Sequence, residues 1–223
     1  MKIAFFTILI LLSTAFAAQA QATYYGTNDI KIFREGREKD FRNKDVTPLL
    51  AEDFQNFKGL NYYEVDKNYL VKAKFTKTQD EKYFLMPTSS GRSAKYMKIG
   101  VLTFKLGEKE FSLAAYQSEK ILTDAKWKDL YGNSIFIPFK DLTNGKETYG
   151  AGRYIYLMTP KGEETTIDFN MAFNPSCAYG SEEFSCPIPP KENFLQAEIK
   201  AGEKAFEYSG KKVIQDSKSK IQN

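Results

Sequence analysis

The chain contains no histidine in its 223 residues. This absence excludes Ser-His-Asp and Cys-His catalysis, histidine-ligated zinc, histidine proton shuttles and haem bound through histidine. Any general acid or base must therefore be an aspartate, a glutamate, a lysine or a tyrosine. We expect no metal centre and no cofactor, and the composition neither requires nor excludes an enzyme.

An excess of charge of one sign is also lacking. The net charge is +4, and the 32 basic residues are interleaved with 28 acidic ones rather than gathered into a stripe. A nucleic-acid-binding surface is therefore not expected. Aromatic residues, in contrast, are abundant, with 18 phenylalanines and 14 tyrosines against a single tryptophan. Together with 42% hydrophobic residues, this composition is typical of a globular domain.

Long hydrophobic runs are missing except at the N-terminus. There, Lys2 precedes an apolar run, Ile3–Leu12, which only Thr7 interrupts, and Ala18-Gln19-Ala20 supplies a cleavage pattern of small residues. The run is too short to span a bilayer comfortably. We therefore expect residues 1–20 to be a cleaved signal peptide and the product to be exported, to the periplasm or the extracellular space. No membrane span is expected after signal cleavage.

Two helical segments are expected at the start of the mature chain. Residues 30–41 carry apolar residues at helical spacing, with Arg37 on the same face, and they follow capping candidates at residues 27–29. A second helix is expected to begin with Thr47 as its N-cap and to stop at Gly59. Both helices are predicted to cover a sheet.

From Leu60 onward the hydrophobic period changes to two, which predicts strands. The expected strands are residues 69–76, 82–86, 99–106, 111–117, 135–139, 152–158, 165–170 and 194–200. Residues 107–110 and 160–163 are predicted to turn two hairpins, and Pro138 implies an edge strand or a bulge. Residues 118–133, which include Trp127, are expected to form a loop with a short helical turn.

These elements predict a mainly β fold. We expect an antiparallel sheet that forms a small barrel or sandwich, with one or two N-terminal helices packed on it. Residues 21–205 are expected to form a single β-rich domain, and residues 206–223, which carry little apolar content, a loose polar tail.

The two cysteines, Cys177 and Cys186, lie nine residues apart. In an exported chain with two cysteines, a disulfide is the default, and we predict one here. A reactive thiol or a two-cysteine metal site is the rival, but without histidine a metal would lack soft partners.

The richest polar stretch runs from Asp141 to Glu203 and suggests a rigid platform of loops. Arg153 begins a strand on the same face as apolar residues, so its charge is expected to need a carboxylate partner. Asp168 and Asn170 share a strand face, and if the two strands are neighbours, Arg153 could meet Asp168 or its neighbour. The pair would either clamp a hairpin or contribute to a polar site.

Two glycines, Gly150 and Gly152, stand immediately before a strand. A phosphate-binding loop would lead from a strand into a helix, so this context does not fit one. We expect instead that these glycines serve a positive φ or a close backbone approach.

Six motifs in this region occur in a fixed order. They are Asp141-x-Thr143-x-Gly145, Thr148-Tyr149-Gly150-x-Gly152-Arg153-Tyr154, Asp168-Phe169-Asn170, Asn174-Pro175-x-Cys177, Cys186-Pro187-x-Pro189-Pro190-x-x-Asn193 and Ala201-Gly202-Glu203. Together they resemble the signature of a bacterial domain-of-unknown-function family, DUF1684, over residues 135–205. The family pattern has an arginine where this chain has Met171, while Phe173 keeps the family's aromatic residue. The resemblance implies a bacterial source and no particular activity.

Three functions fit the sequence. The first is a non-enzymatic exported protein that binds a small molecule or a glycan. The second is a structural or interaction protein whose signature residues only hold the fold together. The third is a hydrolase that uses two carboxylates. The candidate ligand-binding residues are Asp141, Arg153, Asp168, Asn170 and Glu203.

Overall fold

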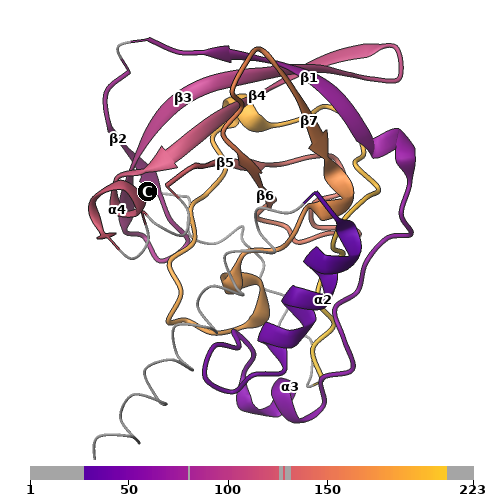
Figure 1. Cartoon of the computed structure of the whole chain (residues 1–223). Coiled ribbons are helices and arrows are strands. Elements are labelled where there is room, and N and C mark those ends of the chain that lie inside the picture. Colours follow the sequence, from indigo (N-terminus) through magenta and orange to yellow (C-terminus); the bar gives the residue numbers. More distant parts are fainter. Residues whose placement is uncertain (1–27, 80, 126–127, 129–131, 210–223) are drawn as a thin grey trace, which may run out of the picture.

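The fold is described from a computed structural model, which covers residues 28–79, 81–125, 128 and 132–209 (Figure 1). The predicted signal peptide, Trp127 and residues 210–223 of the predicted tail lie outside the described residues. The first residues of that tail are packed: Phe206 contacts Tyr179, and the hydroxyl of Tyr208 donates a hydrogen bond to the carbonyl of Ala178 (2.6 Å).

Helix α2, Ile30–Phe41, forms where the sequence predicts it. Asp29 caps its N-terminus, because the carboxylate accepts hydrogen bonds from the backbone N–H groups of Lys31 (2.8 Å) and Ile32 (3.1 Å). The face that carries Phe33, Arg37 and Phe41 is buried. The helix therefore brings one charged side chain into the interior.

Helix α3, Ala51–Gln55, is shorter than predicted and begins later. Its N-cap is Leu50, and the hydroxyl of Thr47 accepts a hydrogen bond from the backbone of Leu49 instead (3.3 Å). Leu49 forms an isolated β-bridge with Gly180. This pairing holds the chain extended at the point where the helix was expected to start.

All the strand pairings among the described residues are antiparallel. In chain order they are β1 Leu70–Lys77, β2 Phe84–Pro87, β3 Ser93–Leu106, β4 Lys109–Ser118, β5 Ser134–Phe139, β6 Arg153–Met158 and β7 Glu164–Asp168. A short helix, α4 Glu119–Thr123, follows β4, and 3-10 turns stand at η1 Lys67–Tyr69, η2 Phe169–Met171, η3 Ser176–Tyr179 and η4 Lys191–Asn193. The strand order is β6-β5-β4-β3-β1-β7, with β2 beside β3.

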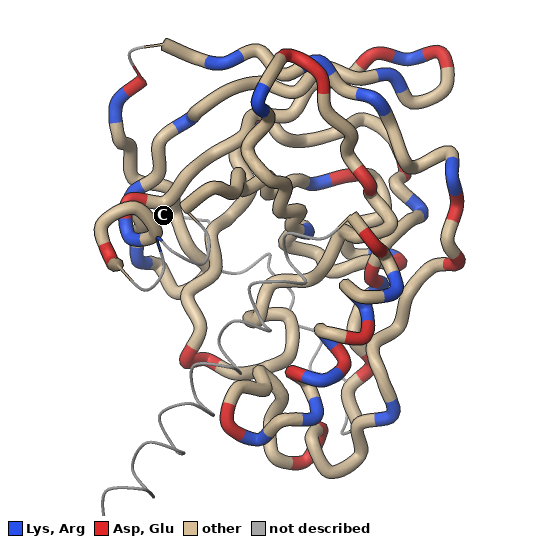
Figure 2. Tube along the Cα trace, viewed as in Figure 1, with Lys and Arg blue, Asp and Glu red and all other residues tan. Residues whose placement is uncertain are grey.

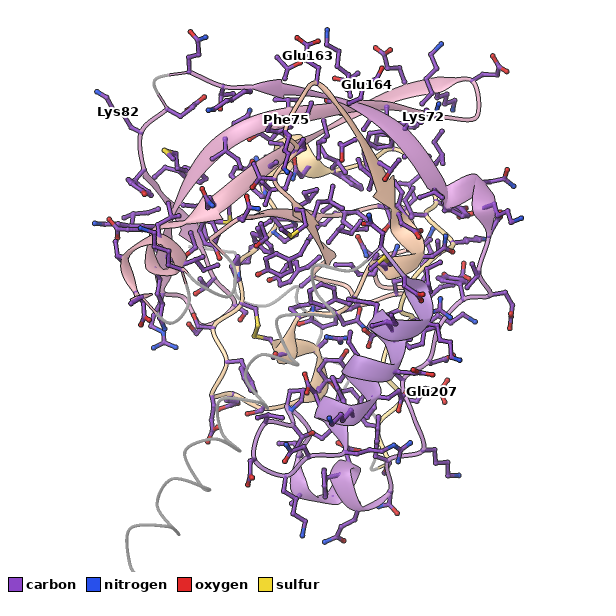
Figure 3. The ribbon with its side chains drawn as sticks, in the orientation of Figure 1. Lys72, Phe75, Lys82, Glu163, Glu164 and Glu207 are labelled. Carbon is purple, nitrogen blue, oxygen red and sulfur yellow. A yellow bond between two sulfur atoms is a disulfide. The ribbon has the colours of Figure 1, made fainter. Side chains whose placement is uncertain are left out.

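The sheet curls into a half-barrel (Figure 1). The prediction of a mainly β, antiparallel fold with N-terminal helices is therefore confirmed. Figure 3 shows the alternation that builds the barrel wall: Phe75 lies on the inner side of β1, whereas Lys72 and Glu164 lie on the outside. Charged residues of both signs are distributed along the whole described trace (Figure 2).

The predicted hairpin between β6 and β7 does not form. These strands are consecutive in the chain, yet they stand at opposite ends of the strand order. β7 pairs with β1, where Leu70 faces Asp168, and β6 pairs with β5. Because the sheet curls, its two ends approach each other, and residues 159–163 cross between them. This leaves an open seam between β6 and β7.

Strand β5 is neither an edge strand nor interrupted by a bulge in its pairing with β6, although Pro138 suggested one or the other. It lies between β4 and β6, but its pairing with β4 is limited to Tyr116 and Phe136. Beyond that point the side chain of Asn193 fills the gap: its amide donates to the carbonyls of Ala114 (2.9 Å) and Pro138 (2.7 Å). In a strand, the N–H and C=O groups of one residue point to the same side. The carbonyl of Pro138 points to Asn193, so the N–H that proline lacks would also have pointed into this gap. The proline therefore removes no hydrogen bond from the ladder between β5 and β6.

Residues 194–200 do not form the predicted strand. Their alternation is real, because Leu195 and Ile199 are buried in the main core. The segment makes only single backbone bonds, such as Leu195 N–H to the carbonyl of Lys140 (2.8 Å) and Leu142 N–H to that of Ala197 (3.0 Å). It therefore packs against the continuation of β5 without joining a ladder.

Apolar side chains fill the half-barrel in one large cluster, which includes Phe104, Phe139 and Phe169. A further cluster around Phe41 and Tyr179 lies under the two helices. Within the described part of the chain, no helix is long and apolar enough to cross a membrane.

Candidate functional site

Arg153, at the start of β6, lies fully buried in a clamp of oxygen atoms. Its Nη2 donates to the carboxylate of Asp141 (2.8 Å) and to the carbonyl of Ile199 (2.8 Å), and its Nη1 donates to the carbonyl of Ala201. The prediction that Arg153 needs a carboxylate is confirmed, but the partner is Asp141 rather than Asp168. The expected pair does not form because β7 lies on the other side of the seam.

Asp141 is held by the loop that follows β5. Its second carboxylate oxygen accepts hydrogen bonds from the backbone N–H (2.8 Å) and hydroxyl (2.5 Å) of Thr143 and from the N–H of Ile199 (3.3 Å). Both oxygens are therefore engaged, and the side chain is 0% exposed. Gly152 contributes by close approach, because it has φ +107° and a Cβ there would lie 2.6 Å from the carbonyl oxygen of Phe139.

Glu203 forms a second buried network that joins helix α2 to the C-terminal segment. It accepts hydrogen bonds from Arg37 (2.9 Å), from the hydroxyl of Tyr179, and from the backbone (3.1 Å) and side-chain amide (3.1 Å) of Asn174. Burial, with the neighbouring charge of Glu203, raises the pKa of Tyr179 well above its ordinary value, so the phenol stays a donor. Both oxygens of this carboxylate are occupied as well.

Asp168 and Asn170 lie side by side, as predicted, but in a turn rather than on one strand. β7 ends at Asp168, whose Oδ1 accepts from the backbone (2.9 Å) and side-chain amide (2.8 Å) of Asn170. Asn170 also pairs with the backbone of Asp66, accepting from its N–H (3.0 Å) and donating to its C=O (2.9 Å). The Oδ2 atom of Asp168 makes no hydrogen bond or ion pair with any residue in the described ranges.

A groove of about 770 Å³ lies along the open seam, and we call it the seam groove. Apolar residues from three elements line it, namely Leu70 of β1, Ile155 and Leu157 of β6, and Met171 of η2. The start of α2, residues 28–31, also lines it. Asp168 lines the groove and is 9% exposed.

The five predicted site residues therefore divide into two groups. Arg153, Asp141 and Glu203 lie in closed networks outside the lining of the seam groove, whereas Asp168 lines it and Asn170 supports Asp168. Sequence reasoning missed the pairing of Arg37 with Glu203. The signal was present, since an arginine on the apolar face of a helix needs a buried partner as much as Arg153 does.

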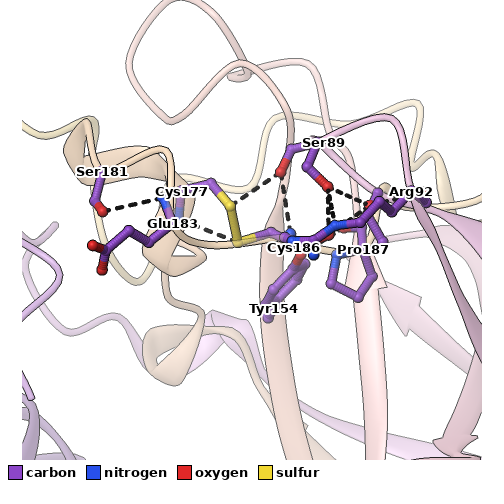
Figure 4. The surroundings of a disulfide bond; sticks show 11 residues. Ser89, Arg92, Tyr154, Cys177, Ser181, Glu183, Cys186 and Pro187 are labelled. Carbon is purple, nitrogen blue, oxygen red and sulfur yellow. Dashed lines mark hydrogen bonds between the residues drawn. A yellow bond between two sulfur atoms is a disulfide. The ribbon is translucent and has the colours of Figure 1, made fainter.

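The predicted disulfide between Cys177 and Cys186 is present, with Cα atoms 6.2 Å apart (Figure 4). It fastens the loop before β3, because the backbone N–H of Ser89 donates to the carbonyl of Cys186 (2.9 Å) and the N–H of Cys186 donates to the hydroxyl of Ser89 (3.1 Å). Among the described residues, no group of three or more Cys, Asp or Glu could hold a metal ion.

Comparisons with known proteins agree with the sequence signature. Residues 55–204 match the family described as protein of unknown function, DUF1684. An uncharacterized protein of Haloarcula marismortui, known from a solution NMR structure, is 31% identical; the match covers 78% of this chain and 91% of that one, with a TM-score of 0.61. A comparison with curated proteins finds no match.

Proposed function

The chain belongs to the DUF1684 family of unknown function, and we propose that it is a non-enzymatic protein that binds a small ligand in the seam groove. The observation that carries this proposal is the combination of apolar walls with one buried carboxylate, Asp168. Small-molecule sites are typically concave, mostly apolar and equipped with a few placed polar groups. A volume of about 770 Å³ lies within the usual range of about 300–1,000 Å³ for such sites.

A small amphipathic molecule fits this groove better than a glycan does. A sugar presents hydroxyl groups on all sides, so a glycan site needs many hydrogen-bonding partners. The strand residues that line the groove are mainly apolar, with Thr166 and Asp168 as the polar exceptions from β7, and the start of α2 adds Asn28, Asp29 and Lys31. The proposed ligand therefore has an apolar body and a single polar end.

Hydrolysis by two carboxylates is not favoured. Asp141 and Glu203 would each have to break several buried hydrogen bonds before taking up or releasing a proton. The same closed networks favour the second candidate function, in which the signature residues only hold the fold together and the protein interacts through its outer surface. The two candidates differ in whether the seam groove binds anything.

The test uses an uncharged apolar dye, N-phenyl-1-naphthylamine, whose fluorescence rises on entering an apolar site. We expect saturable binding to the folded chain and its loss in Leu70→Lys, since Leu70 is 52% exposed and lines the groove. Leu85→Lys is the matched control, because Leu85 is also an exposed leucine on a strand, 63% exposed, but lies outside the groove. Equal binding by both variants would reject the proposal, and so would no binding to the unmodified chain.

We also propose that the protein is exported, as the N-terminal sequence and the disulfide both suggest. Expression of the full chain with a C-terminal tag checks this, by fractionation of the cells and mass measurement of the purified product. We expect the measured mass to correspond to a chain that starts at Gln21. We also expect it to show that the two cysteines are oxidised to a disulfide. Recovery of the intact precursor in the cytoplasm would contradict export.

A further inference from the structure

We propose that the ligand of the seam groove carries a cationic head, such as an alkylammonium group, which binds the carboxylate of Asp168. This inference rests on the proposed function and specifies the chemical class of the ligand. It is carried by Asp168, which among the described lining residues combines a buried carboxylate with an oxygen atom that has no hydrogen-bond partner.

Asp168 is a strong anchor because only half of its carboxylate is used. Oδ1 is fixed by the two bonds from Asn170, so the side chain cannot rotate freely. Oδ2 has no partner within the described residues, although the residue is 9% exposed. Oδ2 is not among the buried side-chain atoms that lack a partner, so it stays accessible from the groove, and a ligand that donates a charge-assisted hydrogen bond can bind it there.

The charges around the groove favour a cation as well. Among the lining residues that the structure describes, two carry carboxylates, Asp29 and Asp168, and one, Lys31, carries an ammonium. The Nζ of Lys31 lies 3.9 Å from a carboxylate oxygen of Glu35, and its side chain is 82% exposed. The excess charge of the lining is therefore negative.

Two positive features nearby do not reverse this sign. The N-terminus of α2 adjoins the groove, but Asp29 already accepts hydrogen bonds from two of its N–H groups. Arg34 is near enough for Asp168 to act on it electrostatically, but it lies outside the lining, donates to the carbonyl of Tyr63 (3.1 Å) and lies over the ring of Tyr62 (4.2 Å).

The body of the ligand is apolar and extended. Leu70, Leu157 and Met171 line the groove from different elements, so a chain of methylene groups can contact all three walls. Burial of such a chain supplies affinity in proportion to the apolar area removed from water, at roughly 25 cal/mol per Å². The carboxylate then selects among chains that differ only in their heads.

The experiment compares decylammonium, decanol and decanoate, which share one chain length, by titration into the isotopically labelled protein and observation of backbone amide shifts. Decylammonium is expected to shift amides of β6 and β7 and to bind at least about tenfold more tightly than decanol, with decanoate weakest. In Asp168→Asn this preference should disappear, while the bonds to Asn170 are kept because an asparagine oxygen still accepts them. Glu164→Gln, which removes an exposed carboxylate from the same strand, should leave the preference intact.

The possible outcomes distinguish the proposal of a cationic head from the proposal that the seam groove binds a ligand. Equal affinity for decylammonium and decanol, or tighter binding of decanoate, would overturn the cationic head while retaining a ligand in the groove. If none of the three compounds shifts amides of β6 or β7, both proposals are overturned. A preference for decylammonium that survives Asp168→Asn would also overturn the role of this carboxylate.

Discussion

Two buried arginines show how single residues hold this protein together. Arg153 is neutralised by Asp141 and by three backbone carbonyls, and Arg37 is neutralised by Glu203. Each pair gives up hydration, so the hydrogen bonds to each guanidinium must offset that loss, although the Nε of Arg153 has no partner among the described residues. Both arginines also lie against aromatic rings, of Phe139 and Phe173 respectively. Such pairs are sensitive to loss of either partner.

Asp141→Asn is predicted to destabilise the protein strongly. It removes the charge opposite Arg153 in a place where both side chains are 0% exposed, so an uncompensated guanidinium remains buried. The expected loss in the free energy of unfolding is about 3–5 kcal/mol, measured by urea denaturation. Lys31→Ala serves as the control, because the Lys31–Glu35 pair is exposed and its loss should cost less than about 1 kcal/mol. Similar values for the two variants would contradict this account of the clamp.

At the scale of elements, one side chain takes the place of a strand ladder. Asn193 accepts a hydrogen bond from the N–H of Ala114 (2.7 Å) and donates to the carbonyls of Ala114 and Pro138, so it fills the gap where β4 and β5 separate. It is fully buried. A proline can therefore stand in an interior strand here.

Asn193→Ala is predicted to open this gap. Three buried backbone groups would lose their hydrogen-bond partner. The free energy of unfolding should fall by roughly 1–3 kcal/mol for each group that stays unsatisfied, and by less for each group that a water molecule reaches. The amide of Ala114 should also exchange its hydrogen faster by orders of magnitude than in the unmodified protein. Hydrogen exchange followed by NMR measures this, with Asn56→Ala as the control at an exposed asparagine. An unchanged exchange rate at Ala114 would show that Asn193 does not bridge the strands.

Much of the element pattern was predictable because it depends on local spacing. The alternation in β1 and the helical spacing in α2 both identified the buried face correctly. Strand pairing was not local: residues 160–163 suggested a hairpin, but curling of the sheet sends β7 to β1. Residues 194–200 alternate like a strand, yet their neighbour is a loop without a ladder to extend.

The residue types of the candidate site were predictable from the sequence, but the pairing of those residues was not. Burial of Arg153 follows from its apolar neighbours, so the sequence required a carboxylate without saying which one. The choice of Asp141 depends on where segment 199–203 places its carbonyls, a long-range feature. The seam groove could not be foreseen either, because it exists only where the two ends of the curled sheet meet.

At the scale of the whole molecule, segment 199–203 ties the half-barrel to the helical layer. Its carbonyls hold Arg153 of β6, and its last residue, Glu203, holds Arg37 of α2. Gly202 permits this path, since it has φ +77° and a Cβ there would lie 2.5 Å from the carbonyl oxygen of Ala172. The two layers are therefore coupled through buried charges rather than through apolar packing alone.

Buried tyrosines should set the alkaline limit of the folded molecule. Burial raises the pKa of Tyr96 to about 12, and burial raises the pKa of Tyr154 and of Tyr179 well above the ordinary value. A raised pKa in the folded state means that the neutral phenol is favoured by folding. The stability that these groups contribute is therefore complete below about pH 10 and is lost as the pH rises toward their folded values.

Because the chain has no histidine, its stability should depend little on pH near neutrality. The two cysteines form a disulfide, so no side chain with an ordinary pKa between about 5 and 8 is present to couple folding to protons. We predict a free energy of unfolding that is flat from about pH 6 to 9 and falls above about pH 10, measured by urea denaturation at each pH. The part of the tyrosinate absorbance that comes from the buried phenols should rise together with the loss of circular dichroism, since these phenols ionise only as the chain unfolds. Ionisation of all the tyrosines near pH 10 with the fold intact would contradict the prediction, because the phenols would then be in contact with water.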